Sequence, residues 1–97
     1  MLHLVADLSR ANLIVERMAA GDDVVLQGGW VWAAFAGHQD NLIVQQLLSQ
    51  GCNIYVLKDQ LSMHGIADHQ LLSGVDAIDY ALLVELTVKN ALIHTWC

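Results

Sequence analysis

The chain has 97 residues, of which 56% are apolar and only 14% are charged, and it contains no proline. This length encloses one hydrophobic core, so we expect a single domain over residues 1–97, and the composition excludes an intrinsically disordered chain. The formal net charge of −6 repels a phosphate backbone, so direct nucleic-acid binding by the chain alone is not expected.

The sequence contains neither a membrane-span pattern nor an export signal. Its longest apolar run, VVLQGGWVWAAFAG at residues 24–37, is interrupted by a glutamine and two glycines. That run falls short of the roughly 20 residues that a membrane helix needs. The amino terminus, MLHLVADLSR, has no basic start and no cleavage site. We therefore expect a cytoplasmic protein whose two cysteines are free thiols.

Short apolar runs alternate with helical patterns along the chain. The first half predicts a strand at residues 2–6, a helix at 9–20, a strand at 23–27, a short helix or turn at 30–37 and a helix between 40 and 51. The second half predicts a strand at residues 53–57, a helical turn at 59–64, a strand at 75–78, a helix at 80–90 and a strand at 92–96. This alternation is typical of βαβ units. We expect one small α/β domain, a flavodoxin-like three-layer fold with a mainly parallel sheet of four or five strands.

The two cysteines are the first candidates for chemistry. Cys52 follows a helix that ends at Gly51 and leads into a strand, which places it at the amino edge of the sheet. Ligand sites form at the opposite, carboxyl edge, and a helix carboxyl terminus does not activate a thiol. We expect Cys52 to be a buried packing residue, with a sulfur-carrier role as the alternative. Cys97, the last residue, is expected to be a solvated tail thiol, and sulfur shuttling is its alternative.

The histidines and the loop after the third strand are the second group. His64 and His69 lie on either side of Asp68, but no cysteine is near enough to complete a zinc site. Lys58, Asp59 and His64 follow the third strand and could form an acid/base group, although solvated side chains are the simpler interpretation. The GG pair after the second strand lacks the spacing of a phosphate-binding loop and predicts a tight turn. We expect no catalytic, cofactor-binding or metal-ligating residue.

The chain also has more apolar surface than one small core needs. One face of the last helix, which the sheet is expected to cover, carries Tyr80, Leu83, Val84, Thr87 and Val88. Leu82 and Leu86 lie on a different face, so we expect this helix to be buried from two sides. Trp30, Trp32 and Phe35 place half of the aromatic residues within six positions, and interfaces favour aromatic side chains. Protein partners are the prediction; absorption of all these residues by one core is the alternative.

Several stretches of the sequence resemble the TusB/DsrH family. They are VVLQGGWVWAAFAG (residues 24–37), LKDQLSMHGI (57–66) and above all IDYALLVELTVKN (78–90), which precedes the near-terminal Trp96. The initial MLH also fits, and the similarity runs over nearly the whole chain. The resemblance implies a small α/β fold and a place, with TusC-like and TusD-like subunits, in a cytoplasmic heterohexamer that is a dimer of trimers.

The resemblance also implies a pathway. The TusB–TusC–TusD-like complex relays persulfide sulfur from a TusA-like donor to a TusE-like acceptor, toward the 2-thiouridine of the tRNA wobble position. The DsrE–DsrF–DsrH counterpart works in dissimilatory sulfur metabolism. In both, the essential sulfur-bearing cysteine belongs to the TusD/DsrE-like partner.

The sequence departs from the family pattern at two places. Some DsrH members carry a cysteine in the first helix, but residues 9–20 contain none, which favours a TusB-like, non-catalytic role. The family's usual ARG after the third strand reads MHG here, with His64 in place of a basic residue. Neither Cys52 nor Cys97 falls on a family motif.

The sequence therefore predicts a non-catalytic subunit of a sulfur relay complex that supports 2-thiouridine formation in tRNA, with no cofactor and no activity of its own. One alternative is a sulfur carrier with its persulfide on Cys52 or Cys97. A second is a DsrH-like subunit in dissimilatory sulfur oxidation. A third is a stand-alone flavodoxin-like binder of a small anion.

Overall fold

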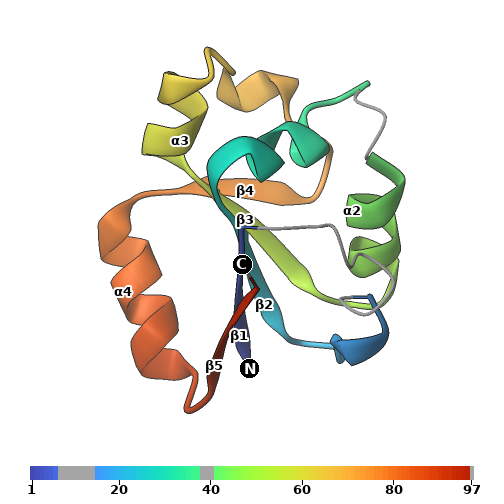
Figure 1. Ribbon diagram of the computed structural model, residues 1–97, viewed down its shortest axis with the longest axis vertical. Coiled ribbons are helices and arrows are strands. Elements are labelled where there is room, and N and C mark those ends of the chain that lie inside the picture. Colours follow the sequence, from blue (N-terminus) through green and yellow to red (C-terminus); the bar gives the residue numbers. More distant parts are fainter. Residues whose placement is uncertain (7–14, 38–40, 97) are drawn as a thin grey trace.

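A computed structural model describes residues 1–6, 15–37 and 41–96, which form a five-stranded sheet with helices on both faces (Figure 1). The strands are β1 (Leu2–Val5), β2 (Asp23–Leu26), β3 (Asn53–Leu57), β4 (Val75–Ile78) and β5 (Ile93–Trp96). Every neighbouring pair is parallel, and the order across the sheet is β4-β3-β2-β1-β5. The order therefore reverses once, where the chain leaves β4 and crosses to the far side of β1.

Helical segments connect these strands. They are the 3₁₀ helix η1 (Gly28–Ala34), α2 (Asn41–Ser49), α3 (Lys58–Met63), the 3₁₀ helix η2 (Asp68–Gln70) and α4 (Tyr80–Lys89). Residues 15–17 are also helical. Within the described ranges, no helix is long and apolar enough to cross a membrane.

Gly51 ends the segment that contains α2. Its φ of +89° lies in the left-handed region, which side chains disfavour, and a Cβ added there would lie 3.3 Å from the Cβ of Ala20. Its N–H donates to the carbonyl of Leu48, and its own carbonyl accepts from the N–H of Gly21. The turn therefore joins the end of α2 to the segment before β2 and sets where β3 begins.

The two faces of the sheet are buried by unequal clusters. The larger cluster lies toward η1, α2 and α3, and its buried members include Val24, Leu26, Val44, Leu47, Ile54, Val56 and Leu61. The smaller cluster lies toward α4 and consists of Leu2, Val25, Leu57, Ile78 and Leu86, with Leu4, Tyr55 and Leu83 against it. Figure 1 shows α4 apart from the other labelled helices, with the sheet between it and α2. The α4 side of the core is therefore thin.

The predicted α/β class and mainly parallel sheet are confirmed. Every strand lies within one residue of its predicted bounds, because each is a short apolar run closed by a turn or helix signal. The short helix predicted at residues 30–37 instead begins at Gly28 and ends at Ala34. Most of the helix predicted at residues 9–20, and the start of the next at Asp40, lie outside the described residues.

The prediction for the face of α4 that the sheet covers was right for Leu83 and wrong for three other residues. Leu83 is partly buried against the smaller cluster, but Tyr80, Val84 and Val88 are 54%, 59% and 81% exposed. Leu86, expected on a different face, is only 6% exposed. Helical periodicity shows that two apolar stripes exist, but it does not show which one turns inward. The contacts between α4 and the rest of the fold decide that, as described below.

Candidate functional site

Cys52 lies at the amino edge of the sheet, immediately before β3, as predicted. Its side chain is buried in the larger cluster, and its Sγ donates to the carbonyl of Ala19 at 3.6 Å. Burial raises the pKa of the Cys52 thiol, and the negative charge of Asp22 raises it further. Because the thiolate is the nucleophilic form, this environment disfavours attack on a sulfur donor. Cys97 lies outside the described residues.

The carboxylate of Asp22, close to Cys52, accepts three hydrogen bonds. Its Oδ1 accepts from the amino-terminal ammonium of Met1 at 3.2 Å, and its Oδ2 accepts from His3 Nε2 and the Ala19 N–H, each at 3.0 Å. Burial of this carboxylate works to raise its pKa, but the three donors outweigh burial, and the pKa lies below its usual value. The group is therefore a stable anion that fixes the start of β1 against the segment before β2.

Asp23, the next residue, makes a separate set of bonds on the α4 side. Its side chain is fully buried, and its carboxylate accepts from Asn53 Nδ2 at 3.0 Å, Asn90 Nδ2 at 3.0 Å and Lys89 Nζ at 3.2 Å. Burial again works to raise the pKa, but these three donors outweigh it and lower the pKa of Asp23. The last turn of α4 is thus bound to the first residue of β2.

His64 is held by Trp32 at the carboxyl edge of the sheet. Trp32 Nε1 donates to His64 Nδ1 at 3.3 Å, and the two rings meet edge to face with centroids 6.0 Å apart. An indole N–H can only donate, so His64 Nδ1 is the acceptor in this bond. The bond joins η1 to the turn that follows α3.

The other members of the predicted polar groups lie at the surface. Lys58, Asp59 and His69 are exposed. In the described part of the chain, no three His, Cys, Asp or Glu side chains are grouped so that they could hold a metal ion. Gly28 has a φ of +59° and begins η1 directly after β2, as expected of a strand-to-helix turn.

The aromatic residues of η1 are partly buried. Trp30, Trp32 and Phe35 pack against the larger cluster, and the rings of Trp32 and Phe35 lie 5.2 Å apart between centroids. These aromatic side chains, which the sequence suggested for a partner interface, are therefore partly used in the core of the chain itself.

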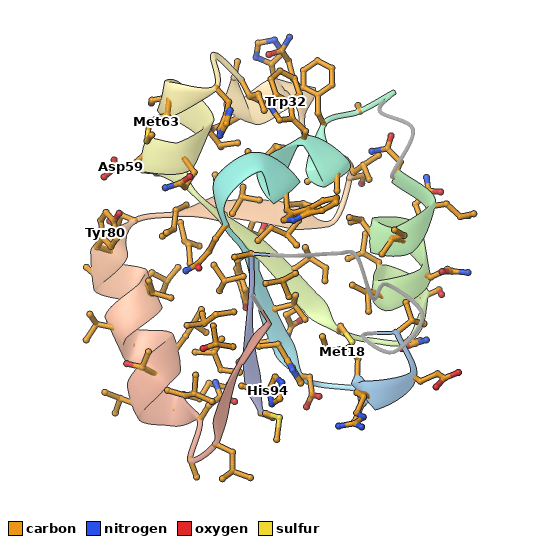
Figure 2. All side chains as sticks on the ribbon, in the orientation of Figure 1. Met18, Trp32, Asp59, Met63, Tyr80 and His94 are labelled. Atoms are coloured by element: carbon orange, nitrogen blue, oxygen red, sulfur yellow. The ribbon has the colours of Figure 1, made fainter. Side chains whose placement is uncertain are left out.

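Much of the apolar surface that the core does not account for lies on and just after α4. We call the side chains of Tyr80, Ala81, Val84 and Val88 the α4 outer face, because all four are exposed and point away from the sheet (Figure 2 labels Tyr80). Leu92 and Ile93, which follow the helix, are 63% and 49% exposed. Among the described residues, few large apolar side chains elsewhere are exposed, and this concentration makes the α4 outer face the strongest candidate for an interaction surface.

Comparison with known proteins identifies the family. A family model described as "DsrH like protein" matches residues 6–92. The chain belongs to the DsrH family. It is 35% identical over 86 residues to Protein TusB of Photorhabdus laumondii, with 88% of this chain and 85% of that protein covered. It is 33% identical over 99 residues to Protein TusB of Erwinia tasmaniensis, with 99% and 100% covered.

Solved structures share the fold of this DsrH family member. The ychN protein from E. coli superposes with a TM-score of 0.80 at 17% identity, over 98% of this chain and 97% of that one. A protein of unknown function from Methanobacterium thermoautotrophicum gives 0.76 at 19% identity, over 97% and 95%. At these identities, the likeness supports the arrangement of the sheet and helices and nothing more specific.

Sequence reasoning missed two features of this surface. The spacing of Tyr80, Val84 and Val88 at four-residue intervals marked one helix face, but nothing in the pattern showed that it points outward. The hydrogen bonds from Lys89 and Asn90 to Asp23 span 66 and 67 positions in the sequence. No local sequence pattern predicts them. An aspartate at the start of an apolar strand was the available hint, because a carboxylate that is buried there needs partners.

Proposed function

We propose that this chain is a non-catalytic subunit of a cytoplasmic sulfur relay complex that supports 2-thiouridine formation at the tRNA wobble position. Its partners in the complex are TusC-like and TusD-like subunits, in a dimer of trimers that contacts a TusA-like donor and a TusE-like acceptor. Membership of the DsrH family and the similarity to proteins named TusB support the choice of pathway.

The state of Cys52 carries the non-catalytic part of the proposal. In persulfide transfer, an acceptor thiolate attacks the outer sulfur of the donor persulfide, a new S–S bond forms, and the donor cysteine leaves as a thiolate. That acceptor must be exposed and deprotonated. Cys52 is 5% exposed, its pKa is raised, and its sulfur lies against the carbonyl of Ala19. This argues against Cys52 as the acceptor, and the proposal places the sulfur on a cysteine of a partner subunit.

Co-expression with TusC-like and TusD-like chains from one genome tests this proposal. We expect the three chains to co-purify and to elute together in gel filtration. The complex is then incubated with a cysteine desulfurase, a TusA-like protein and cysteine labelled with heavy sulfur, and the intact mass of each chain is measured. The added sulfur is expected on the TusD-like chain and not on this one.

Two results would contradict the proposal. If this chain elutes alone, it is not a subunit of that complex. If it gains a sulfur atom that is lost in Cys52→Ser or in Cys97→Ser, then the chain is a sulfur carrier. Cys52→Ala serves as the control for loss of packing, because its melting temperature separates a damaged fold from a lost persulfide.

A further inference from the structure

Contacts between its carboxyl end and the sheet fix the rotation of α4 about its axis. At its start, Asp79 Oδ1 accepts from the N–H of Leu82 at 2.9 Å, which caps the helix. At its end, Lys89 and Asn90 donate to the buried carboxylate of Asp23. Between these points Leu86 is buried against the sheet. The helix cannot roll to bury another stripe without breaking its bonds to Asp23 and exposing Leu86, so the α4 outer face stays exposed in the isolated chain.

The exposed apolar surface continues past the helix on the same side of the sheet. Ile93 of β5 pairs with Leu2 of β1, so the two side chains share a face of the sheet. Leu2 is fully buried beneath the α4 side, whereas Ile93 is 49% exposed. Leu92, just before it, is 63% exposed. Helix α4 covers the middle strands and leaves the margin at β5 open, which widens the surface beyond a single helix.

The charges around this surface are mainly acidic. Asp79 and Glu85 are exposed on or beside α4. Asp76 is exposed on β4, and it pairs with Tyr55 of β3, whose side chain packs against the smaller cluster. Asp76 therefore lies on the same face of the sheet as α4. Lys89 is the basic residue of α4 itself, and its Nζ is bonded to Asp23. Two copies joined through this surface would bring carboxylates against carboxylates, in a chain whose net charge is −6.

We propose that the α4 outer face, extended by Leu92 and Ile93, is the surface on which this chain docks a different protein chain, whose matching surface is apolar at its centre and bordered by lysine or arginine. This inference deepens the proposed function and rests on it, because it names the surface used within the complex. The fixed helix presents the apolar residues, and the acidic border selects a basic partner over a second copy of the chain.

The test measures binding of the TusC-like and TusD-like chains to single variants. Val84→Glu and Val88→Glu are each expected to weaken binding by about tenfold or more, because each buries an unpaired carboxylate in the interface. Leu42→Glu is the matched control. Leu42 is 64% exposed on α2, on the other side of the sheet, and its substitution is expected to change the affinity by less than about twofold.

The acidic border is tested separately. Glu85→Lys is expected to weaken binding by about threefold at low ionic strength, and the difference from wild type is expected to shrink as salt is added. Hydrogen exchange of the wild-type chain gives a readout that needs no variant: amides of residues 80–93 should gain protection in the complex, and those of α2 should not.

The outcomes separate the two proposals. If the wild-type complex forms but Val84→Glu and Val88→Glu bind as well as Leu42→Glu, then the docking surface is wrong and the proposed function stands. If the wild-type chain binds neither partner, both fail. If the chain alone is a dimer by light scattering, and Val84→Glu makes it a monomer, then the surface pairs with a second copy and the choice of a different chain is overturned. Circular dichroism and melting of each variant confirm that the fold is retained.

Discussion

Asp22 and Asp23 are neighbours in the chain, yet their carboxylates fix different parts of the fold. Because successive side chains of an extended segment point to opposite sides, Asp22 reaches Met1 and His3 while Asp23 reaches the end of α4. Each anion is surrounded by three donors, and each pKa is lowered. The pair therefore ties both the first strand and the last helix to the start of β2.

The lowered pKa of Asp23 predicts how stability depends on pH. A carboxyl whose pKa is lower in the folded state stabilises the fold above its unfolded pKa, about 4, and loses that contribution as the pH falls through the lower, folded value. We expect Asp23→Asn to lower the free energy of unfolding by about 2 kcal/mol at pH 7, because a neutral amide cannot accept from all three donors. The difference in the free energy of unfolding between wild type and Asp23→Asn should be constant above about pH 5 and become smaller below it.

Urea unfolding of both proteins between pH 7 and pH 3 measures this difference. Asp68→Asn is the control, since Asp68 is exposed in η2 and takes no part in the bonds of Asp23 to Asn53, Lys89 and Asn90. Curves for wild type and Asp23→Asn that run parallel down to pH 3 would show that the Asp23 carboxylate contributes nothing through its charge.

At the scale of the element, α4 depends on its ends more than on its middle. It has ten residues, fewer than an isolated helix needs to be stable in water. Among these ten residues, all of which the structure describes, only the side chain of Leu86 is buried. Tertiary contacts must therefore hold it. The Asp79 cap satisfies an amide of the first turn, and Asn90 Nδ2 donates both to Asp23 and to the carbonyl of Leu86.

We expect removal of the Asp79 cap to lower the stability of the fold. Asp79→Ala should lower the free energy of unfolding by about 1 kcal/mol, because the N–H of Leu82 loses its acceptor. Asp79→Asn is the control: asparagine caps about as well, so its loss should be only a few tenths of a kcal/mol. Thermal or urea unfolding compares them. Equal losses in the two variants would mean that charge, and not capping, is the contribution of Asp79.

At the scale of the whole molecule, the unequal burial of the two sheet faces separates stability from assembly. The larger cluster, beneath η1 and α2, contains most of the buried apolar side chains, and the smaller cluster beneath α4 contains few. Helix α4 thus presents apolar residues on its outer side as well as its inner side. In an isolated chain, such a surface promotes non-specific association.

Because the outer side of α4 is apolar but not part of the core, we expect solubility and stability to respond differently to substitution of Val88. Val88 is 81% exposed, so Val88→Lys removes little buried area, and a lysine in the last turn of a helix is favourable. We expect the isolated chain to become more soluble, with a melting temperature within about 2 °C of wild type. Precipitation assays and thermal melts measure the two quantities. A large fall in melting temperature would show that Val88 belongs to the core of the free chain.

The sequence by itself determined the α/β class, the position of each strand and the burial of Cys52. Those properties depend on local signals: short apolar runs, the Gly51 turn before Cys52, and the Asp79 cap at the start of the last helix. Only the tertiary structure decided which apolar stripe of α4 faces outward and where the border charges lie. These depend on contacts between distant residues, such as Asp23 with Asn90, and on the placement of β5 beside β1, which leaves Ile93 uncovered. A helical pattern fixes the angles between side chains along one helix, but the direction of the sheet is set by the rest of the chain.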